Sequence, residues 1–152
     1  IRNHGLSKNN LTTRFGLNLR ISEISAAIGK IQMRKLPHLL NQRRKNAKAL
    51  TEILEHSDII LPEPRKNEIV NWYLYTIAMK SRDKAMKKLN ASGIGARVYY
   101  SPSIHETPYY KTRLRLPNTE WAASNVISLP VHPKVRKADL VKMKKIISGS
   151  SN

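Results

Sequence analysis

The sequence contains no cysteine, which excludes disulfide bonds, zinc sites built on thiolates and a cysteine nucleophile. It has no run of about 18 apolar residues, the length that a membrane-spanning helix needs. No leader with a charged start, an apolar stretch and small residues opens the chain. These absences predict a cytoplasmic protein without a membrane span.

Acidic residues are scarce, since aspartate and glutamate total 10. They are too scattered for a pair of catalytic carboxylates, and no cluster has the spacing of metal ligands. The glycine fingerprint of dinucleotide-binding folds, the P-loop and the G-x-S-x-G motif are absent as well. We therefore expect no catalytic residue and no metal site, and the sequence by itself lacks the pattern of a complete enzyme.

Positive charge is abundant. Lysine and arginine total 28, so the formal net charge is 28 − 10 = +18. Residues 1–50 carry eleven positive and one negative group, residues 51–100 eight and six, and residues 101–152 nine and three. This excess indicates an anionic partner, and one interpretation is a stand-alone basic regulatory or nucleic-acid-binding module. No helix-turn-helix, zinc-finger or RNP pattern supports it, and a solvated helix face is the commoner explanation.

The first part of the chain predicts an arm followed by helices. Residues 1–20 are polar and irregular, and Ser22 is a good N-cap for a helix with an apolar stripe of isoleucines at helical spacing. Pro37 predicts a break or kink, with a second helix from about residue 39 to residue 56. The apolar faces of these helices predict packing on something that the sequence does not contain.

Alternating elements follow over residues 57–152. The composition predicts strands over residues 68–79 and 94–100, and between them a helix capped by Ser81 and ended by Gly93 in a left-handed conformation. Asn118 is predicted to cap a short helix, and a last amphipathic helix carries Leu140, Met143 and Ile147. Two helices, strand, helix, strand and two more helices make a small α+β domain.

Two segments have the composition of binding sites. Residues 16–23 (GLNLRISE) place a glycine, Asn18 and Arg20 directly before a helix start, where free N–H groups favour an oxyanion. An ordinary loop with an N-cap is the commoner reason for such a pattern. Residues 99–110 combine tyrosines, prolines and His105 in a stiff loop that could line a ligand pocket, and a surface loop held by aromatic packing explains them equally well.

Read in order, several segments resemble the C-terminal part of the DegT/StrS-type sugar aminotransferases, which are pyridoxal-phosphate enzymes of the aspartate-aminotransferase fold. They cover nearly the whole chain in the family's order and at about its spacing, so no single motif carries the resemblance. The matching segments are IRNHG (1–5), GLNLRISEISAAIGKIQMRKL (16–36), RRKNA (43–47), NWYLYTI (71–77), NASGIGARVYYSPSIHETPYY (90–110), LPNTEWAASNVISLPVHP (116–133) and KADL (137–140).

The resemblance implies a fold-type-I small domain at residues 57–152, linking helices at 21–56 and the end of the large domain at 1–20. In the family, the lysine that forms the Schiff base with pyridoxal phosphate lies upstream of the segment matching IRNHG. The chain also begins at Ile1, and its first methionine is Met33. We therefore expect a piece of a longer enzyme, inactive alone and without tightly bound cofactor.

The resemblance also implies roles for individual residues. Asn18, with Arg20 nearby, would reach the cofactor phosphate of the other subunit of a homodimer. Arg97, Tyr100 and His105 would contact the nucleotide-sugar substrate. The implied reaction moves an amino group from a donor, usually glutamate, to a keto sugar on a nucleoside diphosphate. The partners would be these substrates and a second subunit or a separate N-terminal half. One departure is visible, since the family often has histidine where this sequence has Tyr73.

Overall fold

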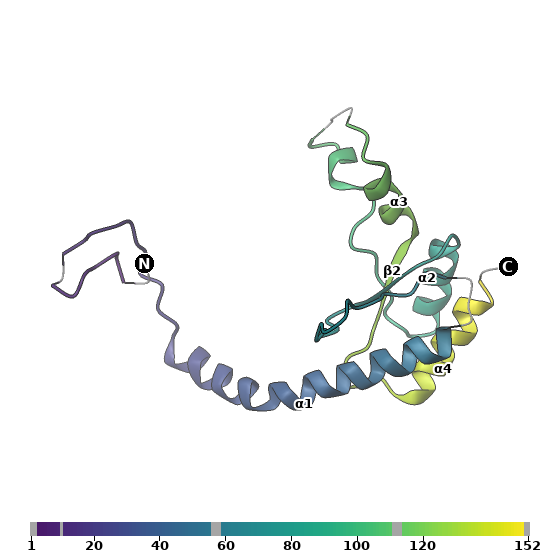
Figure 1. The fold of residues 1–152 in the computed structure, drawn as a ribbon, viewed down its shortest axis with the longest axis horizontal. Coiled ribbons are helices and arrows are strands. Elements are labelled where there is room, and N and C mark those ends of the chain that lie inside the picture. Colours follow the sequence, from purple (N-terminus) through teal and green to yellow (C-terminus); the bar gives the residue numbers. More distant parts are fainter. Residues whose placement is uncertain (1–2, 10, 56–58, 111–113, 151–152) are drawn as a thin grey trace. The chain divides into compact units, whose positions relative to one another are not determined.

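The computed structural model describes residues 3–9, 11–55, 59–110 and 114–150, and Figure 1 shows its ribbon. The chain divides into two compact units, Ile1–Pro37 and His38–Asn152, and each is described here by itself. No helix within these described ranges is long and apolar enough to cross a membrane.

The first unit opens with an irregular loop, as its polar composition predicted. An isolated antiparallel bridge joins Asn3 to Asn18, so the loop folds back on itself. Gly5 has a φ of +68°, which side chains rarely adopt. A β-carbon at this position would also collide with the Arg14 carbonyl oxygen. The turn therefore requires glycine.

Helix α1 spans Glu23–Leu54. It begins where the sequence predicted, since the Ser22 hydroxyl accepts a hydrogen bond from the Ser25 N–H at 3.2 Å. The predicted break at Pro37 is wrong, because α1 continues through this residue. Proline removes one N–H donor and crowds the preceding turn. The runs of good helix formers on both sides outweigh that local cost.

The second unit contains a two-stranded antiparallel sheet. β1 spans Tyr75–Ala78 and β2 spans Val126–Leu129, with the buried Ile77 opposite the buried Ile127. The strand predicted over residues 68–79 is thus shorter than expected. The carbonyl oxygens of residues 70, 72 and 73 accept hydrogen bonds from arginine side chains of α1, so they do not extend the ladder.

The strand predicted over residues 94–100 is wrong. Only Arg97 pairs with the sheet, through an isolated bridge in which its N–H and carbonyl bond with Ser128 at 3.1 and 2.8 Å. β2 was missed in its place. Its sequence, VISL, has four residues and directly follows a helix, so it offers too little length for an alternating pattern.

Among the described residues of this unit, four further helical segments occur. They are α2 (Arg82–Ala91), the 3-10 turn η1 (Ile104–Glu106), α3 (Pro117–Asn125) and α4 (Lys137–Ser148). The predicted core face of the last helix is confirmed, since Leu140, Met143 and Ile147 are buried. Gly93 after α2 has the predicted left-handed conformation, with a φ of +79°.

The predicted helix caps were less accurate. Asn118 lies inside α3, whose first residue is Pro117 and whose N-cap is Leu116. The Glu120 carboxylate accepts the Leu116 N–H at 2.7 Å and replaces a capping side chain. Ser81 occupies the N-cap of α2, yet its hydroxyl makes no capping hydrogen bond.

One hydrophobic core holds the second unit together. The buried side of α1 packs with the sheet and with the inward faces of α2 and α4, which lie side by side in Figure 1. The largest fully buried side chains are those of Leu50, Leu54, Tyr75, Ile77, Leu89, Ile127, Leu129, Val131, Met143 and Ile147. This core fixes the loops that surround the candidate site.

Candidate functional site

A cavity of about 560 Å³ opens in the second unit. Loops at one end of the sheet provide most of its walls, and helices α1 and α4 provide the rest. The lining consists of Arg43, Asp139 and Met143 with residues 73–74, 93–95, 97, 99, 128–132 and 134–136. The volume lies in the range of pockets that hold small organic ligands.

The charged residues that line the cavity are mainly cationic: Arg43, Arg97, Lys134 and Arg136. The only acidic residue of the lining, Asp139, is already paired with Arg136, with Nε–Oδ2 at 3.1 Å. The hydrogen bonds from Arg136 hold the pKa of Asp139 below its usual value, so this carboxylate stays ionised and neutralised by its partner. The side chains of Arg97 and Lys134 have no hydrogen-bond or ion-pair partner within the described part of the chain. Two free cations in one hollow favour an anionic ligand.

Two neighbouring arginines of α1 hold the loop that precedes β1. Arg43 Nη1 donates to the carbonyl oxygens of Trp72 and Tyr73, each at 3.2 Å. Arg44 Nε donates to the Val70 carbonyl oxygen at 3.2 Å, and its Nη2 to the Asn71 side chain at 3.1 Å. We call this set of contacts, from Arg43 and Arg44 to residues 70–73, the arginine clamp. Both arginines belong to the segment RRKNA (43–47), and no local pattern in the sequence indicated that they hold this loop.

Asn46 holds the part of the lining that follows β2, and the sequence analysis missed it. Its side chain is buried in α1, and its amide nitrogen lies 3.0 to 3.4 Å from the carbonyl oxygens of Val131, His132 and Val135. The Gln42 side chain donates to its oxygen at 3.1 Å. A polar residue on the buried side of a helix was the available signal.

The structure brings only part of the predicted substrate site to this cavity. Arg97 lines it, whereas Tyr100 and His105 do not. Tyr100 is largely exposed, and its ring meets the Tyr99 ring edge-on at 5.4 Å. The His105 side chain is only 10% exposed and pairs with Glu120, with Nε2–Oε1 at 3.2 Å.

The predicted cofactor contacts lie in the first unit. Arg20 Nη2 donates to the Asn3 side chain at 2.8 Å, and Asn18 is exposed in the backbone bridge to the same residue. An anchored guanidinium and an exposed amide two residues away suit a phosphate group. This donor set fits the phosphate end of pyridoxal phosphate.

The hydrogen-bonded carboxylate of Glu120 predicts a pH dependence of stability. The hydrogen bond from the Leu116 N–H, and then that from His105, hold the pKa of Glu120 below its usual value. The ionised Glu120 therefore stabilises the folded state at pH values above the usual pKa of a carboxyl group. This stabilisation is lost as the pH falls through the lowered pKa of Glu120. Glu120→Gln should lower the free energy of unfolding at pH 7, and its difference from wild type should shrink towards about pH 3. Urea denaturation at both pH values measures this.

The exposed Glu63 supplies the matched control. Glu63→Gln should leave the unfolding midpoint unchanged at both pH values. An equal loss for Glu120→Gln at neutral and acidic pH would contradict the electrostatic explanation.

The architecture is that of part of an aminotransferase. DesV of S. venezuelae, solved in complex with a ketimine intermediate, is 25% identical with a TM-score of 0.85, over 99% of this chain and 42% of that one. A DegT DnrJ EryC1 StrS aminotransferase from Brucella abortus is 28% identical with a TM-score of 0.81, over 96% of this chain and 40% of that one. DesI, solved in the presence of its TDP-sugar product, is 25% identical with a TM-score of 0.80, over 99% of this chain and 41% of that one.

The family model agrees with this class. The chain belongs to the DegT/DnrJ/EryC1/StrS aminotransferase family, whose model matches residues 1–148. The resemblance seen in the sequence is thereby confirmed. The chain spans about two-fifths of the length of the solved structures it matches.

Proposed function

We propose that this chain is the C-terminal portion of a pyridoxal-phosphate-dependent enzyme that aminates a keto sugar carried on a nucleoside diphosphate. The observation that supports the substrate class is the cationic cavity, in which Arg97 and Lys134 are free to meet a diphosphate. Family membership and the TDP-sugar product of DesI support the same class. Residues 57–152 would form the small domain, residues 21–56 the linking helices and residues 1–20 the end of the large domain.

In this proposal the residues of the chain bind and orient, and none performs the chemistry. Arg97 and Lys134 neutralise the diphosphate and hold the sugar in one position. The arginine clamp and Asn46 keep the two walls of the cavity in place. Asn18 and Arg20 would bind the phosphate of pyridoxal phosphate, which supplies the electron sink for the transfer of the amino group.

We further propose that the isolated chain lacks transaminase activity. The Schiff-base lysine of the family has no counterpart among the segments that match. Treatment of the purified chain with pyridoxal phosphate and borohydride should therefore label no single lysine, as judged by peptide mass mapping. A stoichiometric adduct on one defined lysine would contradict this part of the proposal.

The partner in the complete enzyme is proposed to be a second subunit or an N-terminal half. Its docking surface would include the exposed isoleucines of the first unit, Ile21, Ile24, Ile28 and Ile31, which are 44 to 76% exposed. Apolar surface of this extent usually marks an interface. The mass of the chain in solution, measured by light scattering, tests self-association.

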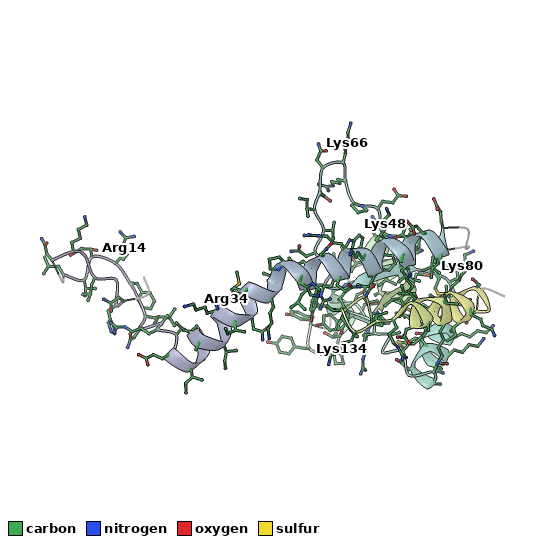
Figure 2. The ribbon with its side chains drawn as sticks, turned by 90° about the horizontal axis from the view of Figure 1, so that it is seen from below. Arg14, Arg34, Lys48, Lys66, Lys80 and Lys134 are labelled. Atoms are coloured by element: carbon green, nitrogen blue, oxygen red, sulfur yellow. The ribbon has the colours of Figure 1, made fainter. Side chains whose placement is uncertain are left out.

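The substrate class predicts the effect of removing a cation from the cavity. Arg97→Ala should weaken the binding of a nucleoside diphosphate by about tenfold, because one charge-assisted hydrogen bond to phosphate is lost. Isothermal titration with uridine diphosphate measures the dissociation constant. Arg65→Ala is the matched control. Arg65 is an exposed arginine beside Lys66, on the loop that projects from this unit in Figure 2. Equal losses in both variants would point to unspecific charge attraction.

Nucleic-acid binding is a second candidate function, and the observation that supports it is the formal net charge of +18, to which lysines of α2 and α4 contribute. Lys88 Nζ donates to the Gly149 carbonyl oxygen at 3.1 Å, and Lys142 Nζ to the Ser92 carbonyl oxygen at 2.6 Å. Their positive charges thus lie along one helix–helix contact. Binding to a DNA duplex that weakens steeply with rising salt would support this function, and no binding at low salt would remove it.

A further inference from the structure

The loop before β1 presents an aromatic ring at the edge of the cavity. Tyr73 lines the cavity and is 80% exposed, whereas its neighbours Trp72 and Leu74 are partly buried. Within the residues that the structure describes, the Tyr73 side chain has neither the burial nor the hydrogen bond that usually stabilises a tyrosine. A role in the core therefore does not explain its position.

The backbone next to this ring is strained. Trp72 has a φ of +50°, a conformation that is costly for a bulky residue and that occurs mainly where the surrounding structure enforces it. The arginine clamp holds this conformation in place, because Arg43 binds the carbonyl oxygens of Trp72 and Tyr73. The Trp72 ring packs against the Tyr75 ring at a centroid distance of 5.3 Å. Trp72 thus anchors the loop inward while Tyr73 points to solvent.

One face of the Tyr73 ring is occupied and the other is open. The Arg43 guanidinium lies 5.9 Å from the ring centroid, which fixes the ring against the clamp. Tyr99 is the other tyrosine of the lining, and it is less suited to stacking. It is 48% exposed, and its ring is already engaged edge-on with Tyr100 at 89°.

We propose that Tyr73 is a stacking platform for the base of a nucleotide whose phosphates bind Arg97 and Lys134. The inference rests on the proposed function and adds to it a specificity-determining residue. An aromatic side chain stacks on any planar base, while the cations of the same cavity take the charge. The site therefore recognises a planar ring joined to a diphosphate, and it gains little from a diphosphate without a base.

The test compares uridine diphosphate with inorganic pyrophosphate by isothermal titration of the full chain. Wild type should bind uridine diphosphate about tenfold more tightly than pyrophosphate. Tyr73→Leu should abolish this preference and leave the binding of pyrophosphate unchanged. Tyr73→Phe should keep the preference, because the ring is retained. Tyr109→Ala, at a tyrosine that is 88% exposed and does not line the cavity, should behave as wild type.

The outcomes separate this inference from the proposed function. Equal affinities of wild type for the two ligands, or a preference that survives in Tyr73→Leu, would overturn the platform while the anion site stands. Failure of wild type to bind either ligand would overturn both. Circular dichroism spectra that match wild type show that each variant is folded. A loss of pyrophosphate binding in a folded Tyr73→Leu variant would assign the residue to the anion site and also overturn the platform.

Discussion

Leu50→Ala should lower the free energy of unfolding of the second unit by about 2–5 kcal/mol. The Leu50 side chain is fully buried on the inner side of α1, where it joins the core formed with the sheet. Truncation to alanine removes apolar contacts and leaves a cavity that the surrounding core refills only in part. Urea denaturation followed by circular dichroism gives the difference from the shift of the midpoint.

The same helix supplies the control for this prediction. Ile24 lies near the start of α1 and is 76% exposed, so Ile24→Ala should change the free energy of unfolding by less than about 0.5 kcal/mol. Similar losses for Leu50→Ala and Ile24→Ala would show that the N-terminal part of α1 is as deeply packed as its C-terminal part. That result would contradict the division of buried and exposed faces described here.

Asn46→Ala should have the second large effect, at about 1–3 kcal/mol, and it should also weaken the binding of ligands in the cavity. The substitution leaves the carbonyl oxygens of Val131, His132 and Val135 without their side-chain donor. All three residues line the cavity, so the wall should become more mobile. Urea denaturation measures the first effect, and titration with uridine diphosphate measures the second.

Asn41 offers a matched comparison, because it is an exposed asparagine on the same helix. Asn41→Ala should leave both measurements at the wild-type values. If Asn46→Ala lowers stability but leaves the dissociation constant unchanged, Asn46 stabilises the fold and has no part in positioning the cavity wall.

The sequence predicted helices better than strands. The buried faces of α2 and α4 repeat every three or four residues, and this period is visible over 10 and 12 residues. β1 and β2 have four residues each, which is too short for a period of two to stand out from chance. The prediction at Pro37 was wrong because it used the helix-breaking tendency of one residue. The stability of the whole helix outweighs that tendency, and it cannot be read from a single position.

The candidate site was less predictable, because distant contacts create it. Arg97 was expected to contact the substrate and does line the cavity. Lys134 and Tyr73 acquire their place there only when the loop before β1 and the loop after β2 meet at one end of the sheet. Asn46 is separated by 85 to 89 residues from the carbonyl groups that it binds. No local pattern specifies such pairs.

The anchored position of Trp72 makes intrinsic tryptophan fluorescence a probe of the loop before β1. The sequence contains two tryptophans, and the other one, Trp121, is 50% exposed on α3 and does not line the cavity. Replacing Trp121 by phenylalanine would leave Trp72 as the single tryptophan, next to the Tyr75 ring and to Arg43, which binds its carbonyl oxygen. Tryptophan emission would then report changes in the loop before β1 without an added label.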